Sequence, residues 1–186
     1  MSTTKTIADL ATAIETAIEQ WDGITWDTGP QDVLHQLTKL GELAAKREED
    51  DHYTASQMRK AISAALEPDH GTFWADDGSY QAQCLARDWR DLRAEIETLD
   101  EDSSAEDIET ARQHAEWIVD AERKAVEANA EAARAHGEAA LEAAEAGDWD
   151  TAVEELEQAC QIEREYGDDP AWGPAYELAV ELSPEA

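Results

Sequence analysis

The side chains best suited to chemistry, five histidines and two cysteines, are scattered along the 186-residue chain. Cys84 and Cys160 form no C-x-x-C pair and have no histidine cluster nearby, so neither a metal site nor a disulfide framework is indicated. A Glu-x-x-His spacing runs from Glu67 to His70, but Pro68 forbids the continuous helix that a di-metal bundle site needs. No Walker loop, G-x-S-x-G or G-x-G-x-x-G sequence is present. The sequence therefore predicts a protein that is not an enzyme and holds no cofactor or metal.

Acidic residues dominate the chain and are spread over its whole length. The sequence has 45 Asp and Glu against 14 Lys and Arg, which gives a formal net charge of −31. Residues 1–100 carry 20 acidic and 9 basic side chains, and residues 101–186 carry 25 and 5. Free nucleic acid would be repelled, because phosphate binding depends on Lys and Arg releasing counterions.

This charge has three possible origins. Disorder is disfavoured, because 42% of the residues are hydrophobic and seven are Trp. Adaptation to a salt-rich, halophilic host is favoured by the dispersion of the charge, since concentrated salt screens self-repulsion. The remaining origin is functional, an acidic surface that mimics nucleic acid or binds a basic partner.

Apolar residues recur at spacings of three and four along most of the chain, which predicts an all-α, multi-helix bundle. Helices are expected at about 6–22, 30–45, 55–66 and 80–99, and residues 68–80 form either a short hairpin or an irregular loop. Ser103 or Ser104 can cap a long alanine-rich helix from Ala105 to Ala146, which Gly137 either divides or leaves intact. We expect two domains, a helical core at 1–100 and a long helix with a helical hairpin at 101–186.

Alanines repeat every seven residues along the predicted long helix. The alanines of the repeat are Ala111, Ala125, Ala132, Ala139 and Ala146, and Ile118 takes the place of an alanine between the first two. Such a stripe permits the close helix approach of an antiparallel hairpin or a short coiled coil. Alanine is also the best helix former, so the stripe is equally compatible with an exposed helix.

Residues 146–159 resemble the turn and second helix of a tetratricopeptide repeat. The turn appears as Gly-Asp-Trp at 147–149, and the small packing positions match Ala152 and Ala159, with the bulky Leu156 between them. The preceding helix agrees less well, because Ala139 and Ala140 fit the small positions but the larger positions of the family fall on His136 and Ala143. The resemblance implies a helical hairpin used for protein–protein contact rather than catalysis. Pro-Ala-Trp at 170–172, followed by Ala175 and Tyr176, has the features of the start of another repeat. We expect Trp149, Trp172 and Tyr176 to make such contacts.

Residues 53–60, Tyr-Thr-Ala-Ser-Gln-Met-Arg-Lys, are similar to the start of the small helical subunit of type III CRISPR effector complexes. That family lies along the guide–target RNA. The resemblance implies phosphate contacts by Arg59, Lys60, Arg87, Arg90 and Arg93. The three arginines at 87–93 can instead pair with acidic neighbours on their own helix.

These observations together lead us to expect a non-catalytic protein-interaction or assembly subunit from a halophilic organism. An RNA-contacting CRISPR small subunit and an acidic nucleic-acid mimic are the alternatives. The expected partner is another protein or a second copy, with RNA only in the CRISPR alternative and no small-molecule substrate evident. No secretory signal and no apolar run of about 20 residues is apparent, so we expect a cytoplasmic protein that does not bind membranes.

Overall fold

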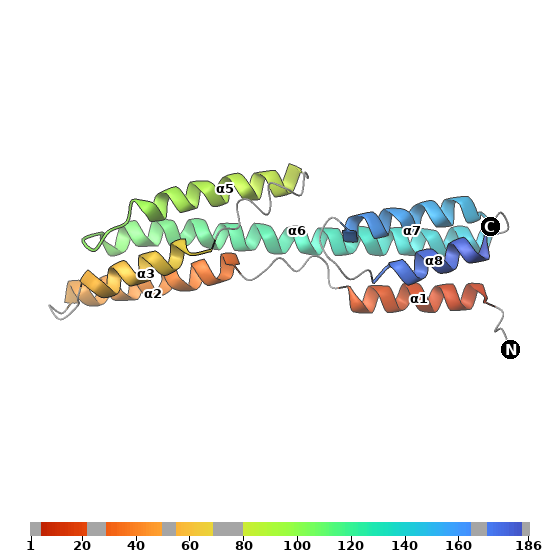
Figure 1. Cartoon of the computed structure of the whole chain (residues 1–186), viewed down its shortest axis with the longest axis horizontal. Coiled ribbons are helices and arrows are strands. Elements are labelled where there is room, and N and C mark those ends of the chain that lie inside the picture. The colour runs from red at the N-terminus through yellow and green to blue at the C-terminus, as the bar shows by residue number, and fades with distance from the viewer. Residues whose placement is uncertain (1–4, 22–28, 50–54, 69–79, 165–170, 184–186) are drawn as a thin grey trace. The chain divides into compact units, whose positions relative to one another are not determined.

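A computed structural model describes residues 5–21, 29–49, 55–68, 80–164 and 171–183. These residues form seven helices and no strand, so the predicted all-α bundle is confirmed. The helices are α1 (Ile7–Gln20), α2 (Gly29–Glu49), α3 (Ala55–Leu66), α5 (Tyr80–Glu97), α6 (Ala105–Ala146), α7 (Trp149–Arg164) and α8 (Gly173–Leu182) (Figure 1). The choice between hairpin and loop at 68–80 falls on residues 69–79, which lie outside the described ranges.

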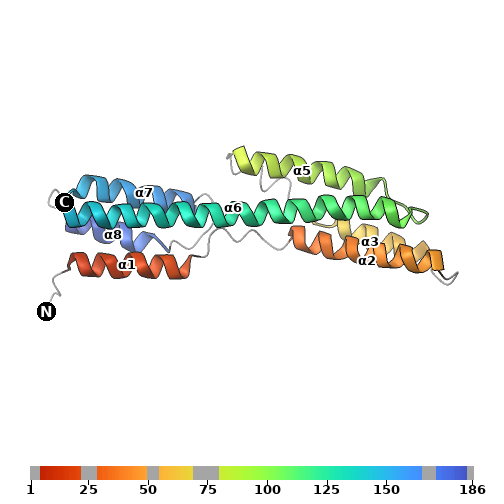
Figure 2. The same ribbon diagram turned by 180° about the vertical axis from the view of Figure 1, so that it is seen from behind.

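The chain forms two compact units that share α6. The first unit comprises residues 1–25 and 124–186, and the second comprises residues 26–123. In the first unit α1, α7 and α8 lie along the C-terminal part of α6 (Figure 1), and in the second α2, α3 and α5 lie along its N-terminal part (Figure 2). This division differs from the expected domains at 1–100 and 101–186, because α1 packs against α8 near the other end of the sequence.

Each unit buries its own hydrophobic core. In the second unit the buried side chains recur every three or four residues, which places them on one face of each helix. The main contributors are Val33, Leu37 and Leu40 from α2, Met58 and Ile62 from α3, Trp89, Leu92 and Ile96 from α5, and Ile108 and Ile118 from α6. The core of the first unit is richer in alanine, and its largest fully buried side chain is Trp172.

The buried stripe of α6 follows the helix pitch rather than the predicted seven-residue repeat. The repeat holds as far as Ala125, but the next buried alanines are Ala133 and Ala140, each one residue beyond the predicted position. A straight helix has about 3.6 residues per turn, so a strict repeat of seven drifts around it by about 20° per heptad. The stripe from Ile108 to Ala144 therefore advances by one residue, and α6 remains a single helix through Gly137.

Gly147 and Asp148 make the turn between α6 and α7 that the sequence predicts. Gly147 has φ +83°, and its N–H donates to the carbonyl of Ala144 at 3.1 Å, while the N–H of Asp148 donates to Ala143 at 2.9 Å. This pair of bonds is the glycine-dependent Schellman ending of a helix. Asp148 then caps α7, because its carboxylate accepts the backbone N–H of Thr151 at 3.2 Å.

Candidate functional site

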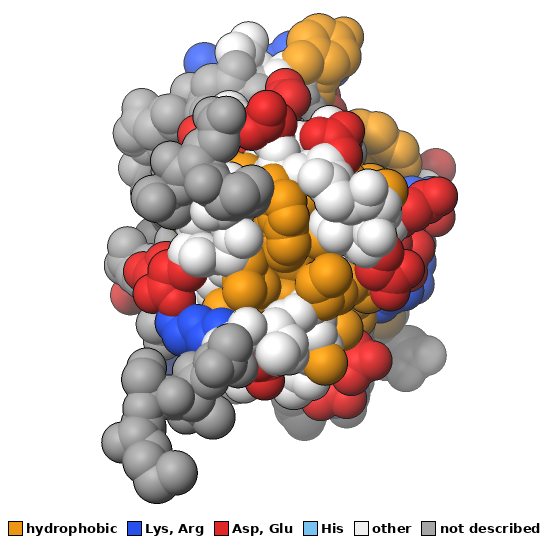
Figure 3. Space-filling model, turned by 90° about the vertical axis from the view of Figure 1, so that its right-hand side faces the viewer, with side chains coloured by type: hydrophobic (Ala, Val, Ile, Leu, Met, Phe, Trp, Pro, Cys, Tyr) orange, Lys and Arg blue, Asp and Glu red, His pale blue; other side chains and the backbone are white. Residues whose placement is uncertain are grey.

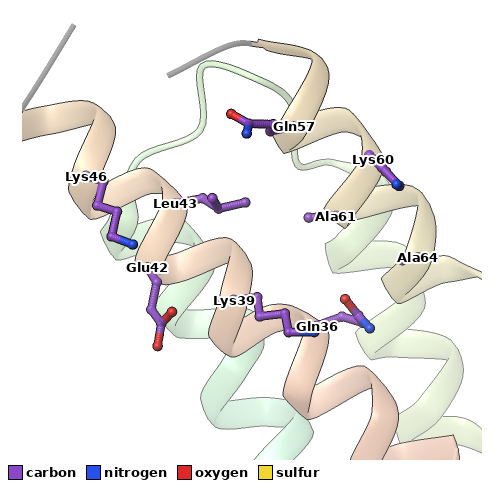
Figure 4. Close-up of a pocket in the computed structure, with 9 residues that line it drawn as sticks. All are labelled: Gln36, Lys39, Glu42, Leu43, Lys46, Gln57, Lys60, Ala61 and Ala64. Carbon is purple, nitrogen blue, oxygen red and sulfur yellow. The ribbon is translucent and has the colours of Figure 1, made fainter. Parts of the chain in front are cut away.

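A groove lies between α2 and α3 in the second unit, with a volume of about 450 Å³ (Figure 4). It is lined by Gln36, Lys39, Glu42, Leu43 and Lys46 from α2 and by Gln57, Lys60, Ala61 and Ala64 from α3. We call this feature the lysine groove. Helical spacing produces it, because on each helix the lining residues fall next to the face that is buried in the core.

The base of the lysine groove is aliphatic. Figure 4 shows Leu43 of α2 pointing toward Ala61 of α3, and Ala64 lies one turn further along α3. Leu43 and Ala61 are partly buried against the core of the second unit. The alanines leave room above the helix backbone, so an apolar side chain from another molecule can enter the groove.

The rim of the groove carries an unusual concentration of positive charge for this chain. Three of its five lysines, Lys39, Lys46 and Lys60, line the groove, against the single acid Glu42. Helix α3 contains two basic residues and no acidic one. None of the three lysines makes an ion pair with a side chain that the structure describes, although the chain has 45 acidic residues.

The nearby arginines, in contrast, are used within the fold. Arg59 pairs with Glu101 through two hydrogen bonds of 2.9 and 3.2 Å. Arg47 donates to the backbone carbonyls of Glu101 and, at 2.8 Å, Ser103. The α2–α3 pair is therefore tied by its arginines to the segment before α6, while its lysines remain available.

Of the residues suggested for RNA contact, only Lys60 lines the lysine groove. The three arginines of α5 interact locally: Arg87 pairs with Asp88 at 3.1 Å, Arg90 donates to the carbonyl of Ala86 at 3.2 Å, and Arg93 lies 3.5 Å from Glu97. Arg87 and Arg93 thus pair with acidic neighbours on their own helix, as the alternative interpretation expects. Arg90 instead bonds to the backbone, and Arg59 pairs with the distant Glu101.

The residues suggested for protein contact lie in the first unit and differ in exposure. Trp172 is 1% exposed, so its ring belongs to the core and does not form part of a contact surface. Its backbone N–H donates to the buried carboxylate of Glu163 at 3.0 Å, and that carboxylate also accepts the N–H of Ala171, which caps the start of α8. Trp149 and Tyr176 are partly buried against the same core.

Two histidines of α6 join helices through carboxylates. Nδ1 of His136 lies 2.6 Å from Oε2 of Glu155 on α7, and Nδ1 of His114 lies 3.1 Å from Oε2 of Glu95 on α5. His136 thus links α6 to α7 by a polar contact. In the described parts of the chain, no three His, Cys, Asp or Glu side chains gather in a way that could hold a metal ion.

Lys39, Leu43 and Lys46 line the lysine groove but are not among the site residues predicted from the sequence. Their signal was present in the sequence, because they lie three to four residues apart and three of the five lysines fall between residues 39 and 60. The signal was hidden because spacing alone does not show that α3 lies beside α2 and forms the second wall.

None of the described helices combines the length and apolar character needed to cross a bilayer. Comparison with known proteins adds no assignment, since no family model, curated protein or solved structure matches this chain.

Proposed function

We propose that this protein is a non-catalytic interaction or assembly subunit of a halophilic organism and that it binds another protein through the lysine groove. The observation that carries the proposal is the groove itself, with an aliphatic base and three lysines that lack ion pairs within the described structure. Lysines on a chain of charge −31 would ordinarily find acidic neighbours. Their availability favours an acidic partner from outside the chain.

Other surfaces support an interaction role. Figure 3 looks at the first unit from the side where α6 gives way to α7, and hydrophobic side chains gather at the centre of this view with acidic side chains around them. In the second unit, the side chains of Tyr80 and Trp117 are 84% and 52% exposed. Apolar and aromatic surface of this kind is typical of protein–protein contacts.

The two alternatives receive less support. The CRISPR small-subunit role depends on Lys60 and on four arginines, and all four arginines interact within the fold. The nucleic-acid mimic depends on carboxylates alone, and it gives no role to a cationic groove.

Affinity purification of the tagged chain from its native cells, at their own ionic strength, tests the proposal. A variant with Lys39→Glu, Lys46→Glu and Lys60→Glu provides the comparison. We expect the wild-type chain to recover a defined protein in fixed stoichiometry and the variant to lose it. Absence of any stable partner, together with a monomeric mass by light scattering, would contradict an interaction or assembly role.

A further inference from the structure

We infer that the lysine groove binds one acidic amphipathic helix, about three turns long, supplied by a partner protein. The inference rests on the proposed function and specifies the chemistry of the partner. The lining of the lysine groove provides what such a helix requires, an aliphatic base between two walls that carry positive charge.

The length of the groove sets the length of the bound helix. Its lining runs from Gln36 to Lys46 on α2, which at a rise of 1.5 Å per residue spans about 15 Å. On α3 it runs from Gln57 to Ala64, about 10 Å. A helix of about three turns matches these walls, and its apolar residues at i, i+3 or i+4, and i+7 would meet Leu43 and the two alanines.

The charges fix which residues flank the apolar stripe of the bound helix. Lys39 and Lys46 are seven residues apart on one wall, so they lie two turns apart on the same side of α2. Lys60 lies on the other wall. Carboxylates on both flanks of the bound helix would meet lysines on both walls.

The acidity of the rest of the chain makes this site selective for an acidic partner. The described helices other than α3 each carry more acidic than basic residues. An acidic helix is therefore repelled from most of the surface and attracted to the groove. These charges orient the helix as it approaches and make its binding more specific.

Nucleic acid suits the groove less well than an acidic helix. Single-stranded RNA is usually held by bases stacked on aromatic or arginine side chains. The lining of the lysine groove has neither, and its base is aliphatic.

The inference is tested with a synthetic peptide of about 14 residues, three to four helical turns. It carries leucines on one face and glutamates on both flanks, and its binding to the full-length chain is followed by fluorescence anisotropy. Two matched peptides replace all glutamates with lysine or all leucines with serine. We expect the parent peptide to bind at least about tenfold more tightly than either matched peptide. Its affinity should decrease when KCl is raised from about 0.1 M to 1 M, because salt screens the charges.

Single charge reversals locate the binding site. Lys39→Glu, Lys46→Glu and Lys60→Glu should each weaken peptide binding by about fivefold at low salt. Lys124→Glu, which makes the same charge change on α6 outside the groove, should alter it by less than about twofold. Circular dichroism checks that each variant keeps its helix content, as expected for exposed lysines.

Equal affinity for the glutamate and lysine peptides would overturn the inference. So would reversals of the groove lysines that change peptide affinity no more than Lys124→Glu does. The third such result is a single-stranded RNA oligonucleotide that binds more tightly than the glutamate peptide and depends on Lys46. That result would make RNA the occupant of the groove and would also overturn the inference. If a native partner is recovered equally by wild type and groove variants, the inference fails while the interaction role stands. If the peptide binds as expected but no native partner exists, the proposed function fails and the chemistry of the groove stands.

Discussion

Glu122 is a carboxyl group on the buried stripe of α6, at a position where its neighbours along the stripe are alanine and isoleucine. The residue is 8% exposed, and its Oε1 has no hydrogen-bond partner among the described residues. Burial raises its pKa from 4.5 to about 7, because an unpaired charge loses its hydration there. The helix therefore contains one side chain whose ionisation opposes folding.

Glu122→Gln should make the protein less sensitive to alkaline pH. In the unfolded chain Glu122 ionises near pH 4.5, while in the folded chain it keeps its proton until about pH 7. Stability contributed by this residue is thus present below pH 4.5, is lost as the pH rises to about 7, and stays lost above that value. Relative to wild type, the glutamine variant should gain about 1–3 kcal/mol at alkaline pH and little near pH 4.5.

Urea unfolding of both proteins across this pH range measures the difference. Glu127→Gln is the matched control, because Glu127 is exposed on the same helix and carries the same chemical change. A stability difference for Glu122→Gln that does not vary with pH would contradict the proposed burial of the charged group.

The helices differ in how closely they approach their neighbours, and two glycines show this difference. A Cβ atom added at Gly137 of α6 would lie 2.5 Å from Cζ3 of Trp172 and 3.2 Å from Cγ2 of Ile14. A Cβ atom added at Gly41 of α2 would lie 3.7 Å from Cγ2 of Ile108, an ordinary van der Waals contact. Glycine at 137 is therefore required by the packing of the first unit, whereas glycine at 41 is not required in the second.

Gly137→Ala and Gly41→Ala should have opposite effects on stability. Alanine is favoured over glycine inside a helix by about 0.5–1 kcal/mol, so Gly41→Ala should stabilise the chain by about that amount. Gly137→Ala should destabilise it by about 1–3 kcal/mol, because the buried ring of Trp172 cannot move away freely. Thermal unfolding followed by circular dichroism compares the two variants, and a stabilising Gly137→Ala would show that α6 and α8 are less closely packed than described.

At the scale of the whole molecule, charge repulsion opposes folding. The formal charge of −31 is shared between 45 acidic and 14 basic side chains. The described ion pairs are mostly exposed, as for Arg59–Glu101 and Arg123–Asp120, and pairs of this kind contribute little stability. Dissolved cations must therefore supply much of the screening that lets two acidic bundles stay compact.

The melting temperature should consequently rise with KCl, most steeply at low ionic strength. The Debye length falls from about 10 Å at 0.1 M to about 3 Å at 1 M, so most of the repulsion is removed within this range. Sucrose at equal osmolarity is the control, because it acts by exclusion from the surface without screening charge. A melting temperature that stays constant from low salt to 1 M KCl, where the Debye length is about 3 Å, would contradict this account of the charge.

Features that depend on neighbours along the chain were predictable from the order of residues alone. Apolar spacing located the helices, Gly147 and Asp148 located the turn before α7, and the seven-residue alanine repeat located α6 as far as Ala125. Each of these rests on local backbone geometry or helix pitch, which the order of residues specifies directly.

Contacts between distant segments, in contrast, became known only from the folded chain. It placed α1 with α8, enclosed Trp172 against Gly137, paired Arg59 with Glu101, and brought Lys60 alongside Lys39 and Lys46 to form a groove. An amphipathic face specifies that a helix must be covered but not which helix covers it, because many apolar stripes are nearly equivalent. The candidate site depends on this choice of neighbours, and for that reason it could not be located before the fold was known.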